Sequence, residues 1–194
     1  MMSGFCLSPK KIQLAAIMSD TLVIYAHPSP RHSTVTRDLL EVFTARADVR
    51  VHSLYDLYPD FDIDVAAEQQ ALLAARNIVW LAPVHWYSFP AMMKHWIDSV
   101  LAHGWAYGKG GQALHGKRVW WVTSAGAGEQ EYAADGSHFR PFVDFIAPIE
   151  GTARYCGMQW LPPFIVHAYA HLDPAQQAAL RNQLAQACEE NFRA

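Results

Sequence analysis

Short apolar runs alternate along the chain with segments whose apolar residues recur at helical spacing. The runs predict strands near residues 21–27, 49–54, 77–83, 118–124 and 160–166. The intervening segments predict helices near 34–46, 65–75, 90–102, 139–156 and 174–192. Because strands that alternate with helices form parallel sheets with right-handed crossovers, the pattern predicts one α/β domain.

Two of the predicted helices carry clear signals. The last one has Asp173 at the N-cap, Pro174 at the first helical position and Gln176 to complete a capping box. Its inner face is predicted at i, i+4 spacing by Leu180, Leu184 and Cys188. The third helix should bury the apolar residues Met93, Trp96, Ile97, Val100 and Leu101.

The loop after the first predicted strand leads directly into a helix whose first residues carry hydroxyl groups. Ser33 and Thr34 are N-cap types, and Thr36 follows within the first turn. The free N–H groups and the positive end of the helix dipole favour an anion there. The chain has no GxGxxG or Walker motif to clamp a pyrophosphate, so the loop predicts a site for a single terminal phosphate.

Two further loops complete this site at the carboxyl edge of the predicted sheet, where ligands bind in open α/β folds. Pro83–Pro90 contains Trp86 and Tyr87, which could wall a flat ligand; the alternative is an aromatic loop packed for stability. Ser124–Glu129 has small residues that allow backbone amides to approach a planar ligand; the alternative is a flexible turn. Together the three loops predict a site for a phosphorylated, flat, redox-active ring, flavin mononucleotide (FMN).

These loops also carry a family resemblance. Through Pro83–Pro90, and through the segments Ile24–Pro28, Leu54–Phe61, His103–Gly108 and Tyr155–Phe164, the chain resembles the flavodoxin-like NAD(P)H:quinone oxidoreductases. Within them it most resembles the ancillary proteins of bacterial glutathione-regulated potassium-efflux systems. The resemblance covers roughly residues 21–192. It implies a flavodoxin-like three-layer fold with a five-stranded parallel sheet in the order 2-1-3-4-5.

The resemblance also implies an activity and a set of site residues. The cofactor would be FMN, with FAD as the alternative. NADH or NADPH would donate the hydride, and a quinone would then accept the electrons, so that the kinetics would be ping-pong. The catalytic residues would be Tyr132 and His138, which otherwise are surface loop residues. The implied flavin-binding residues are His27, Ser33, Thr34, Val35, Thr36, Val84, His85, Trp86, Tyr87, Ser124, Ala125, Gly126 and Ala127. The family often has two threonines and two glycines where this chain has residues 124–127, so a hydroxyl is lost at Ala125.

The glycine-rich connection His103–Gly116 carries two large aromatic residues, Trp105 and Tyr107. The resemblance implies a two-fold homodimer in which both residues roof the flavin of the partner subunit. The alternative is an internal lid over the chain's own site. Two-fold homodimers are the commonest soluble oligomers, which favours the dimer.

Composition narrows the class of protein. The 194 residues are 52% hydrophobic and 17% charged, which suits one domain with a full core. A net charge of −3 gives no basic surface for nucleic acid, and no segment is long and apolar enough to span a bilayer. Three widely spaced cysteines match neither a disulfide framework nor a zinc site, so the natural compartment is a reducing cytoplasm, and no metal is predicted. Residues 1–20 are expected to be a poorly ordered extension to a domain of residues 21–194.

Two functional classes follow from the resemblance. One is an enzyme, and the other is a regulatory subunit docked on a potassium efflux transporter at the cytoplasmic face of the inner membrane. The family supports both roles in one protein, with a free-standing quinone reductase as the alternative. A flavodoxin-type electron carrier is disfavoured, because such carriers have strongly acidic surfaces and the net charge here is only −3.

Overall fold

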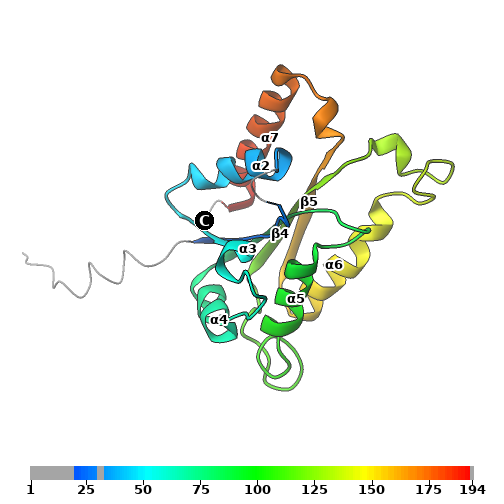
Figure 1. Ribbon diagram of the computed structural model, residues 1–194. Coiled ribbons are helices and arrows are strands. Elements are labelled where there is room, and N and C mark those ends of the chain that lie inside the picture. The colour runs from blue at the N-terminus through cyan, green and yellow to red at the C-terminus, as the bar shows by residue number, and fades with distance from the viewer. Residues whose placement is uncertain (1–19, 30–32, 193–194) are drawn as a thin grey trace, which may run out of the picture.

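The centre of the fold is a five-stranded parallel sheet. The computed structural model describes residues 20–29 and 33–192, and the sheet has the order β2-β1-β3-β4-β5 (Figure 1). Neighbouring strands all pair in parallel. The strands are β1 (Thr21–Tyr25), β2 (Val49–Ser53), β3 (Asn77–Pro83), β4 (Arg118–Ala125) and β5 (Gln159–His167). The predicted fold class and strand order are confirmed. The predicted extension lies, except for Asp20, outside the described residues.

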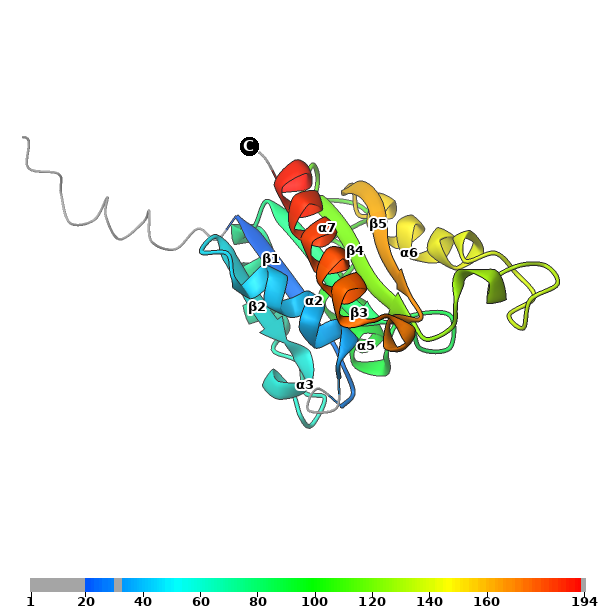
Figure 2. The same ribbon diagram turned by 90° about the horizontal axis from the view of Figure 1, so that it is seen from above.

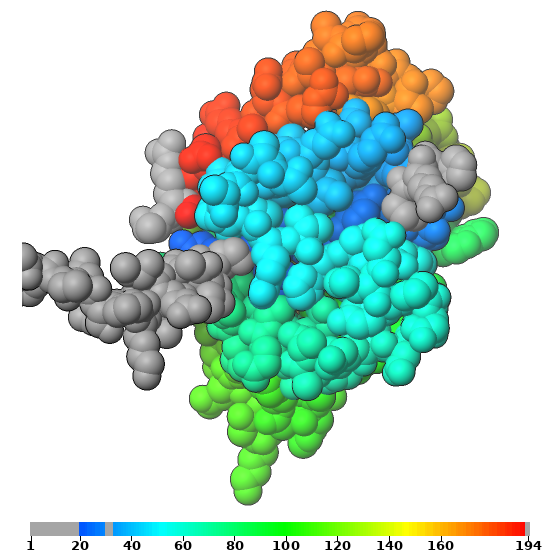
Figure 3. Space-filling model, turned by 60° about the vertical axis from the view of Figure 1, so that its left-hand side comes forward, coloured from blue at the N-terminus to red at the C-terminus, as the bar shows by residue number. Residues whose placement is uncertain are grey.

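Helices cover both faces of this sheet (Figure 2). One face carries α2 (Val35–Thr44) and α7 (Pro174–Phe192), which lie side by side at the surface in Figure 3. The other face carries α3 (Leu54–Leu57), α4 (Val65–Ala74), α5 (Ala91–Val100) and α6 (Val143–Tyr155). The result is the three-layer arrangement that alternating strands and helices predict.

The core is split between the two faces because side chains alternate along each strand. Val23 and Trp120 pack with α2 and α7, whereas their neighbours Leu22 and Trp121 pack with the helices of the opposite face. All four side chains are at most 1% exposed. Strands buried on both faces need apolar residues at every position, which is why the sequence shows continuous runs rather than alternation.

The strongest helix signals are confirmed. Asp173 Oδ1 accepts hydrogen bonds from the N–H groups of Ala175 and Gln176, at 2.9 and 2.8 Å. The Gln176 side chain accepts in return from the N–H of Asp173 at 2.9 Å, so the capping box of α7 is complete. Leu184 and Cys188 are fully buried on its inner face. The five residues predicted to face the core from the third helix are all buried, four within α5 and Leu101 as its C-cap.

Two α-helices differ from the prediction. α6 begins at Val143 rather than near residue 139. Phe139 has φ +59°, a left-handed conformation that a right-handed helix excludes, so residues 139–142 belong to the preceding loop. The sequence did not predict α3, because four residues are too few to show a helical period. In the described part of the chain, no helix is both long and apolar enough to cross a membrane.

Candidate flavin site

The loops after β3 and β4 meet at the carboxyl edge of the sheet. The N–H of Val84 donates to the carbonyl oxygen of Ser124 at 2.8 Å, which joins the two loops where their strands end. Beyond this bond lies a cavity of about 290 Å³. It is lined by Val84, Trp86, Tyr87, Gly126, Ala127, Tyr132 and His138. The structure therefore brings together the aromatic loop, the small-residue loop and the two residues implied to be catalytic.

The aromatic wall of this cavity is a tight turn. The backbones of His85 and Ser88 exchange two hydrogen bonds, of 2.9 and 3.0 Å. Between them Trp86 and Tyr87 have φ +48° and +64°. Positive φ at both central positions is the type I′ geometry, for which Asn-Gly is the favoured pair. Two aromatic residues in left-handed conformations are strained, and strain of this kind clusters at functional sites.

The turn holds its two aromatic rings differently. Tyr87 stacks on Phe145 of α6, with ring centroids 4.8 Å apart and an interplanar angle of 27°. Trp86 is 93% exposed, which is rare for so large an apolar side chain. One ring is thus fixed against the protein, and the other is free to cover a ligand.

The small-residue loop is shorter than predicted. Ser124 and Ala125 are the last residues of β4 and are buried in the sheet, so only Gly126 and Ala127 line the cavity. A Cβ atom built on Gly126 would have no heavy atom within 4 Å. Open space therefore lies over the backbone at this point, as a planar ligand contacting that backbone requires.

Tyr132 and His138 form a stacked pair at the wall of the cavity. Their ring centroids are 4.2 Å apart with an interplanar angle of 9°. The ring of Tyr87 meets that of His138 edge-on, and its hydroxyl lies 3.3 Å from Nδ1 of His138. Burial, with a smaller effect of nearby Tyr87, raises the pKa of Tyr132, so its phenol stays protonated at neutral pH.

The first loop carries hydroxyl groups and an imidazole, but none of its described residues lines this cavity. The hydroxyl oxygens of Ser33 and Thr36 are 2.5 Å apart, and both side chains are buried. Ser33 Oγ also accepts from the N–H of Arg37 at 3.2 Å, whereas Thr34, the N-cap of α2, makes no side-chain capping bond. Val35, the first residue of α2, is half-buried and packs against the core. Residues 30–32 of this loop lie outside the described residues.

His27 lies in the first loop, close enough to His85 of the aromatic turn to feel its charge. Its Nδ1 accepts from the N–H of Ser29 at 3.1 Å. Burial and the neighbouring imidazole of His85 lower the pKa of His27, so the side chain is neutral at neutral pH. A neutral His27 does not itself offer a positive charge to an anion.

Trp105 and Tyr107 lie away from this cavity. Their connection precedes β4 and is therefore at the amino edge of the sheet, and Figure 1 shows it at the opposite end of the molecule from residues 126–142. Tyr107 packs against Tyr155, with centroids 5.2 Å apart, and lines a second cavity, of about 390 Å³, between α5 and α6. Neither residue therefore lines the cavity beside Tyr132.

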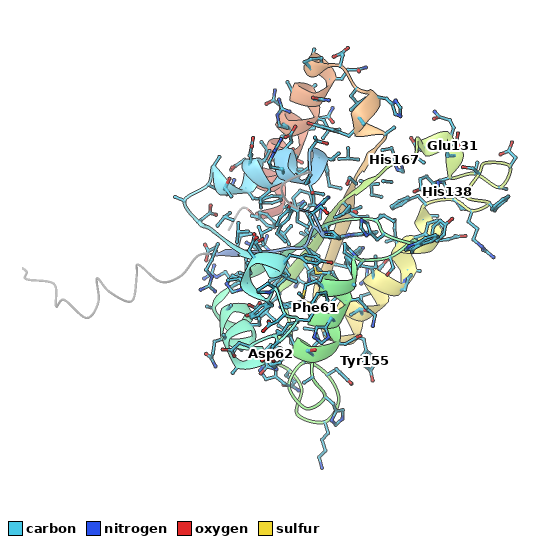
Figure 4. All side chains as sticks on the ribbon, viewed as in Figure 1. Phe61, Asp62, Glu131, His138, Tyr155 and His167 are labelled. Carbon is cyan, nitrogen blue, oxygen red and sulfur yellow. The ribbon has the colours of Figure 1, made fainter. Side chains whose placement is uncertain are left out.

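Sequence reasoning missed three residues that support the site. His167, Phe142 and Phe145 all contact the ring of Tyr132, at centroid distances of 5.4, 5.0 and 6.1 Å. A signal for His167 was available in the sequence. The residue ends the fifth predicted strand, and that strand end lies at the same edge of the sheet as the ligand loops. Figure 4 shows His138 and His167 near each other at this edge. Among the described residues, no three His, Cys, Asp or Glu side chains are grouped to hold a metal ion.

A 2-1-3-4-5 parallel sheet with its ligand loops at the carboxyl edge defines the flavodoxin-like class. A family model described as a flavodoxin-like fold matches residues 19–191, and the chain belongs to this family. More specifically, it is similar to the glutathione-regulated potassium-efflux system ancillary protein KefF of Salmonella arizonae, with 54% identity over 147 residues. The match covers 75% of this chain and 82% of KefF. The predicted family is thereby confirmed.

Two solved structures show the same fold with recognisable sequence similarity. General stress protein 14 from Treponema denticola, in complex with FMN, is 36% identical with a TM-score of 0.78, covering 87% of this chain and 94% of that one. An NADPH-quinone reductase from P. pentosaceus is 28% identical with a TM-score of 0.79, covering 90% and 99%.

Proposed function

We propose that this protein is an FMN-dependent NAD(P)H:quinone oxidoreductase that also serves as the ancillary subunit of a glutathione-regulated potassium efflux transporter. One observation carries the enzymatic part. The stacked Tyr132–His138 pair lines the same cavity as the exposed aromatic turn and the open backbone at Gly126. The similarity to an FMN complex and to an NADPH-quinone reductase supports it.

The residues present fit a flavin. Gly126 leaves room for a ring against the backbone, and Trp86 and Tyr87 offer aromatic faces to it. Ser33 and Thr36 place hydroxyls at the start of α2, where a phosphate would lie. When bound, FMN would supply a ring that accepts hydride from NADH or NADPH and delivers electrons to a quinone. FAD is the alternative cofactor, as the family resemblance implies.

The catalytic role of the chain's own residues is electrostatic. Tyr132 keeps its proton on Oη at neutral pH, so it can donate a hydrogen bond to negative charge that develops in the cavity. His138 lies parallel to it and is oriented by the Tyr87 hydroxyl. Donors fixed before the reaction need no reorganisation during it, which is the main advantage of such a site.

The experiment is reconstitution of the purified protein with FMN, followed by quinone-dependent oxidation of NADPH and NADH. We expect a dissociation constant of roughly 1 μM or tighter, equivalent to about 8 kcal/mol. Replacing Tyr132→Phe and His138→Ala should slow reduction by NADPH on the order of ten- to a hundredfold per residue while FMN affinity changes little. His171→Ala, an exposed histidine outside the cavity, is the control. Failure to bind FMN or FAD in any redox state would overturn the proposal.

The same proposal includes a homodimer. Four exposed aromatic or aliphatic side chains lie on the side of the molecule formed by α5, α6 and the aromatic turn: Trp86, Tyr87, Val143 and Tyr155. The 390 Å³ groove between α5 and α6 is on this side as well. A second copy that covered this face would carry its own Trp105 and Tyr107 towards the flavin of its partner. Association with the transporter, from the cytoplasmic side of the membrane, rests on the similarity to KefF.

A further inference from the structure

His167, the last residue of β5, touches the candidate site without lining its cavity. The centroid of its ring lies 5.4 Å from that of Tyr132, with an interplanar angle of 63°. The corresponding values for the ring of Phe142 are 5.1 Å and 82°. Its Nδ1 lies 3.3 Å from the carbonyl oxygen of Ala127. A carbonyl oxygen only accepts, so this nitrogen carries the proton and donates.

This hydrogen bond matters because the surrounding segment forms most of its other hydrogen bonds within itself. Residues 126–142, which we call the Tyr132 loop, connect β4 to α6. Most of its hydrogen bonds are local. The N–H of Tyr132 donates to the backbone carbonyl oxygen of Glu129 at 3.0 Å, and the N–H of His138 donates to that of Glu131 at 3.1 Å. Near its end the loop also bonds to the adjoining helix α6, for example from Arg140 to Asp144. In the part of the chain that the structure describes, two hydrogen bonds join the loop to elements other than α6. They are His167 to Ala127 and the contact between His138 and Tyr87.

The same imidazole also fixes the plane of Tyr132. His138 stacks on one face of the phenol ring, whereas His167 and Phe142 meet it at steep angles. Tyr132 therefore cannot rotate without displacing His167 or His138. The neighbouring backbone is anchored at the same place, because the N–H of Ala168 donates to the carbonyl oxygen of Ala125 at 3.0 Å.

We infer that His167 is a positioning residue of the flavin site: its N–H holds the start of the Tyr132 loop, and its ring holds Tyr132 in the plane on which His138 stacks. The inference rests on the proposed function, because positioning has a meaning only if the cavity is used for reduction. Figure 4 shows His167 reaching the loop from β5, beside His138.

The test compares His167→Phe, which keeps an aromatic edge but loses the donor, with His167→Asn, whose side-chain amide restores one near Nδ1. His171→Phe, four residues along and exposed, is the matched control. Amide hydrogen exchange of the flavin-free protein measures the loop directly. In H167F the N–H groups of Tyr132 and His138 should exchange roughly tenfold faster or more, with recovery in H167N and no change in H171F.

Activity of the FMN-loaded protein provides the second measurement. H167F should lower kcat for quinone reduction about tenfold with little change in the KM for NADPH, because a misplaced donor costs transition-state stabilisation rather than binding. H167N should recover most of that loss. Unchanged exchange in H167F, or an H167N variant as impaired as H167F, would overturn the inference. If the wild type binds FMN but reduces no quinone, the proposed function fails, and the exchange result alone decides whether His167 holds the loop.

Discussion

Gly126 is the residue at which ligand binding and folding can be separated most cleanly. A methyl group there meets no atom of the protein, and its φ is not positive, so Gly126→Ala should keep or slightly raise stability, by about 0.5 kcal/mol. The methyl group would occupy the space of a ring lying on the backbone. FMN affinity should therefore fall about tenfold or more, equivalent to about 1.4 kcal/mol.

Gly151→Ala is the matched control for this measurement. Gly151 also has open space around its Cβ position, but it lies within α6 and outside the cavity. Its replacement should leave FMN affinity unchanged and stabilise the helix by about 1 kcal/mol. Equal FMN affinities for the wild type and G126A, by titration of flavin fluorescence, would show that no ring lies against this backbone.

At the residue scale, the sequence indicated most of the cavity wall but not its support. Trp86, Tyr87, Gly126 and Ala127 follow strands directly, so their place at one edge can be deduced from topology. His167 also ends a strand, yet its role depends on a contact with Tyr132, which is 35 residues away in the chain and lies in a long loop. Such contacts leave no periodic signal.

At the scale of the element, the least predictable feature is the buried carboxylate of α4. Glu68 is 1% exposed and accepts hydrogen bonds from His52 Nδ1, Tyr58 Oη and Trp96 Nε1, at 2.8, 2.7 and 2.9 Å. A glutamate in a helix is normally expected on the solvent face. Its three partners come from β2, the segment after α3, and α5, so only the folded chain reveals that α4 is fixed by them.

Glu68→Gln should destabilise the protein by roughly 2 kcal/mol at pH 7, because donors that now share one carboxylate would meet an amide. Burial alone would raise the pKa of Glu68, but the hydrogen bonds and charge of His52, with those of Tyr58 and Trp96, lower it below its ordinary 4.5. The folded state therefore binds fewer protons than the unfolded state in this range. The stabilisation is complete above about pH 4.5 and is lost as pH falls through the folded pKa.

Urea unfolding of both proteins between pH 3 and 7 would check this sign. The wild type should lose stability on acidification more steeply than E68Q. Glu150→Gln, which breaks only the exposed pair with Arg154, should cost no more than about 0.5 kcal/mol. A wild type and E68Q with parallel pH profiles would show that Glu68 is not ionised in the folded protein.

The helix boundaries show where local signals suffice. The start of α7 is set by a side chain and a proline within four residues, and it is placed correctly. The start of α6 was placed four residues early, because apolar residues between 139 and 146 continue the helical pattern into the loop. Phe142, the N-cap of α6, packs its ring against Tyr132 instead, and this tertiary contact overrides the pattern.

At the scale of the whole molecule, the groove between α5 and α6 leads to a prediction about assembly. Tyr155 is 70% exposed at its rim, so Tyr155→Asp should leave the monomer folded and place a charge in the dimer interface. Sedimentation of the wild type should give twice the 21.8 kDa mass of one chain, and that of Y155D should give a single chain. Leu73→Asp, on α4 and outside the groove, should remain dimeric. A monomeric wild type would contradict the prediction.

The regulatory role can be separated from the chemistry in cells. A chain with Tyr132→Phe and His138→Ala that still binds FMN should support potassium efflux as the wild type does, because the subunit would act by docking. Efflux measured in cells with this variant, the wild type and a deletion would decide the question. If the deletion leaves efflux unchanged, the transporter role fails and a free-standing quinone reductase remains.

The aromatic turn has a consequence of another kind, for spectroscopy. Four of the seven tryptophans, Trp80, Trp96, Trp120 and Trp121, have fully buried side chains and therefore emit from an apolar environment. Trp105 and Trp160 are half-buried, whereas the indole of Trp86 projects almost entirely into water, so Trp86 makes the largest contribution to the long-wavelength edge of the emission spectrum. The protein thus carries an intrinsic fluorophore at the mouth of its own cavity. Quenching confined to that edge would register any flat molecule that arrives there, without a label or an assay of turnover.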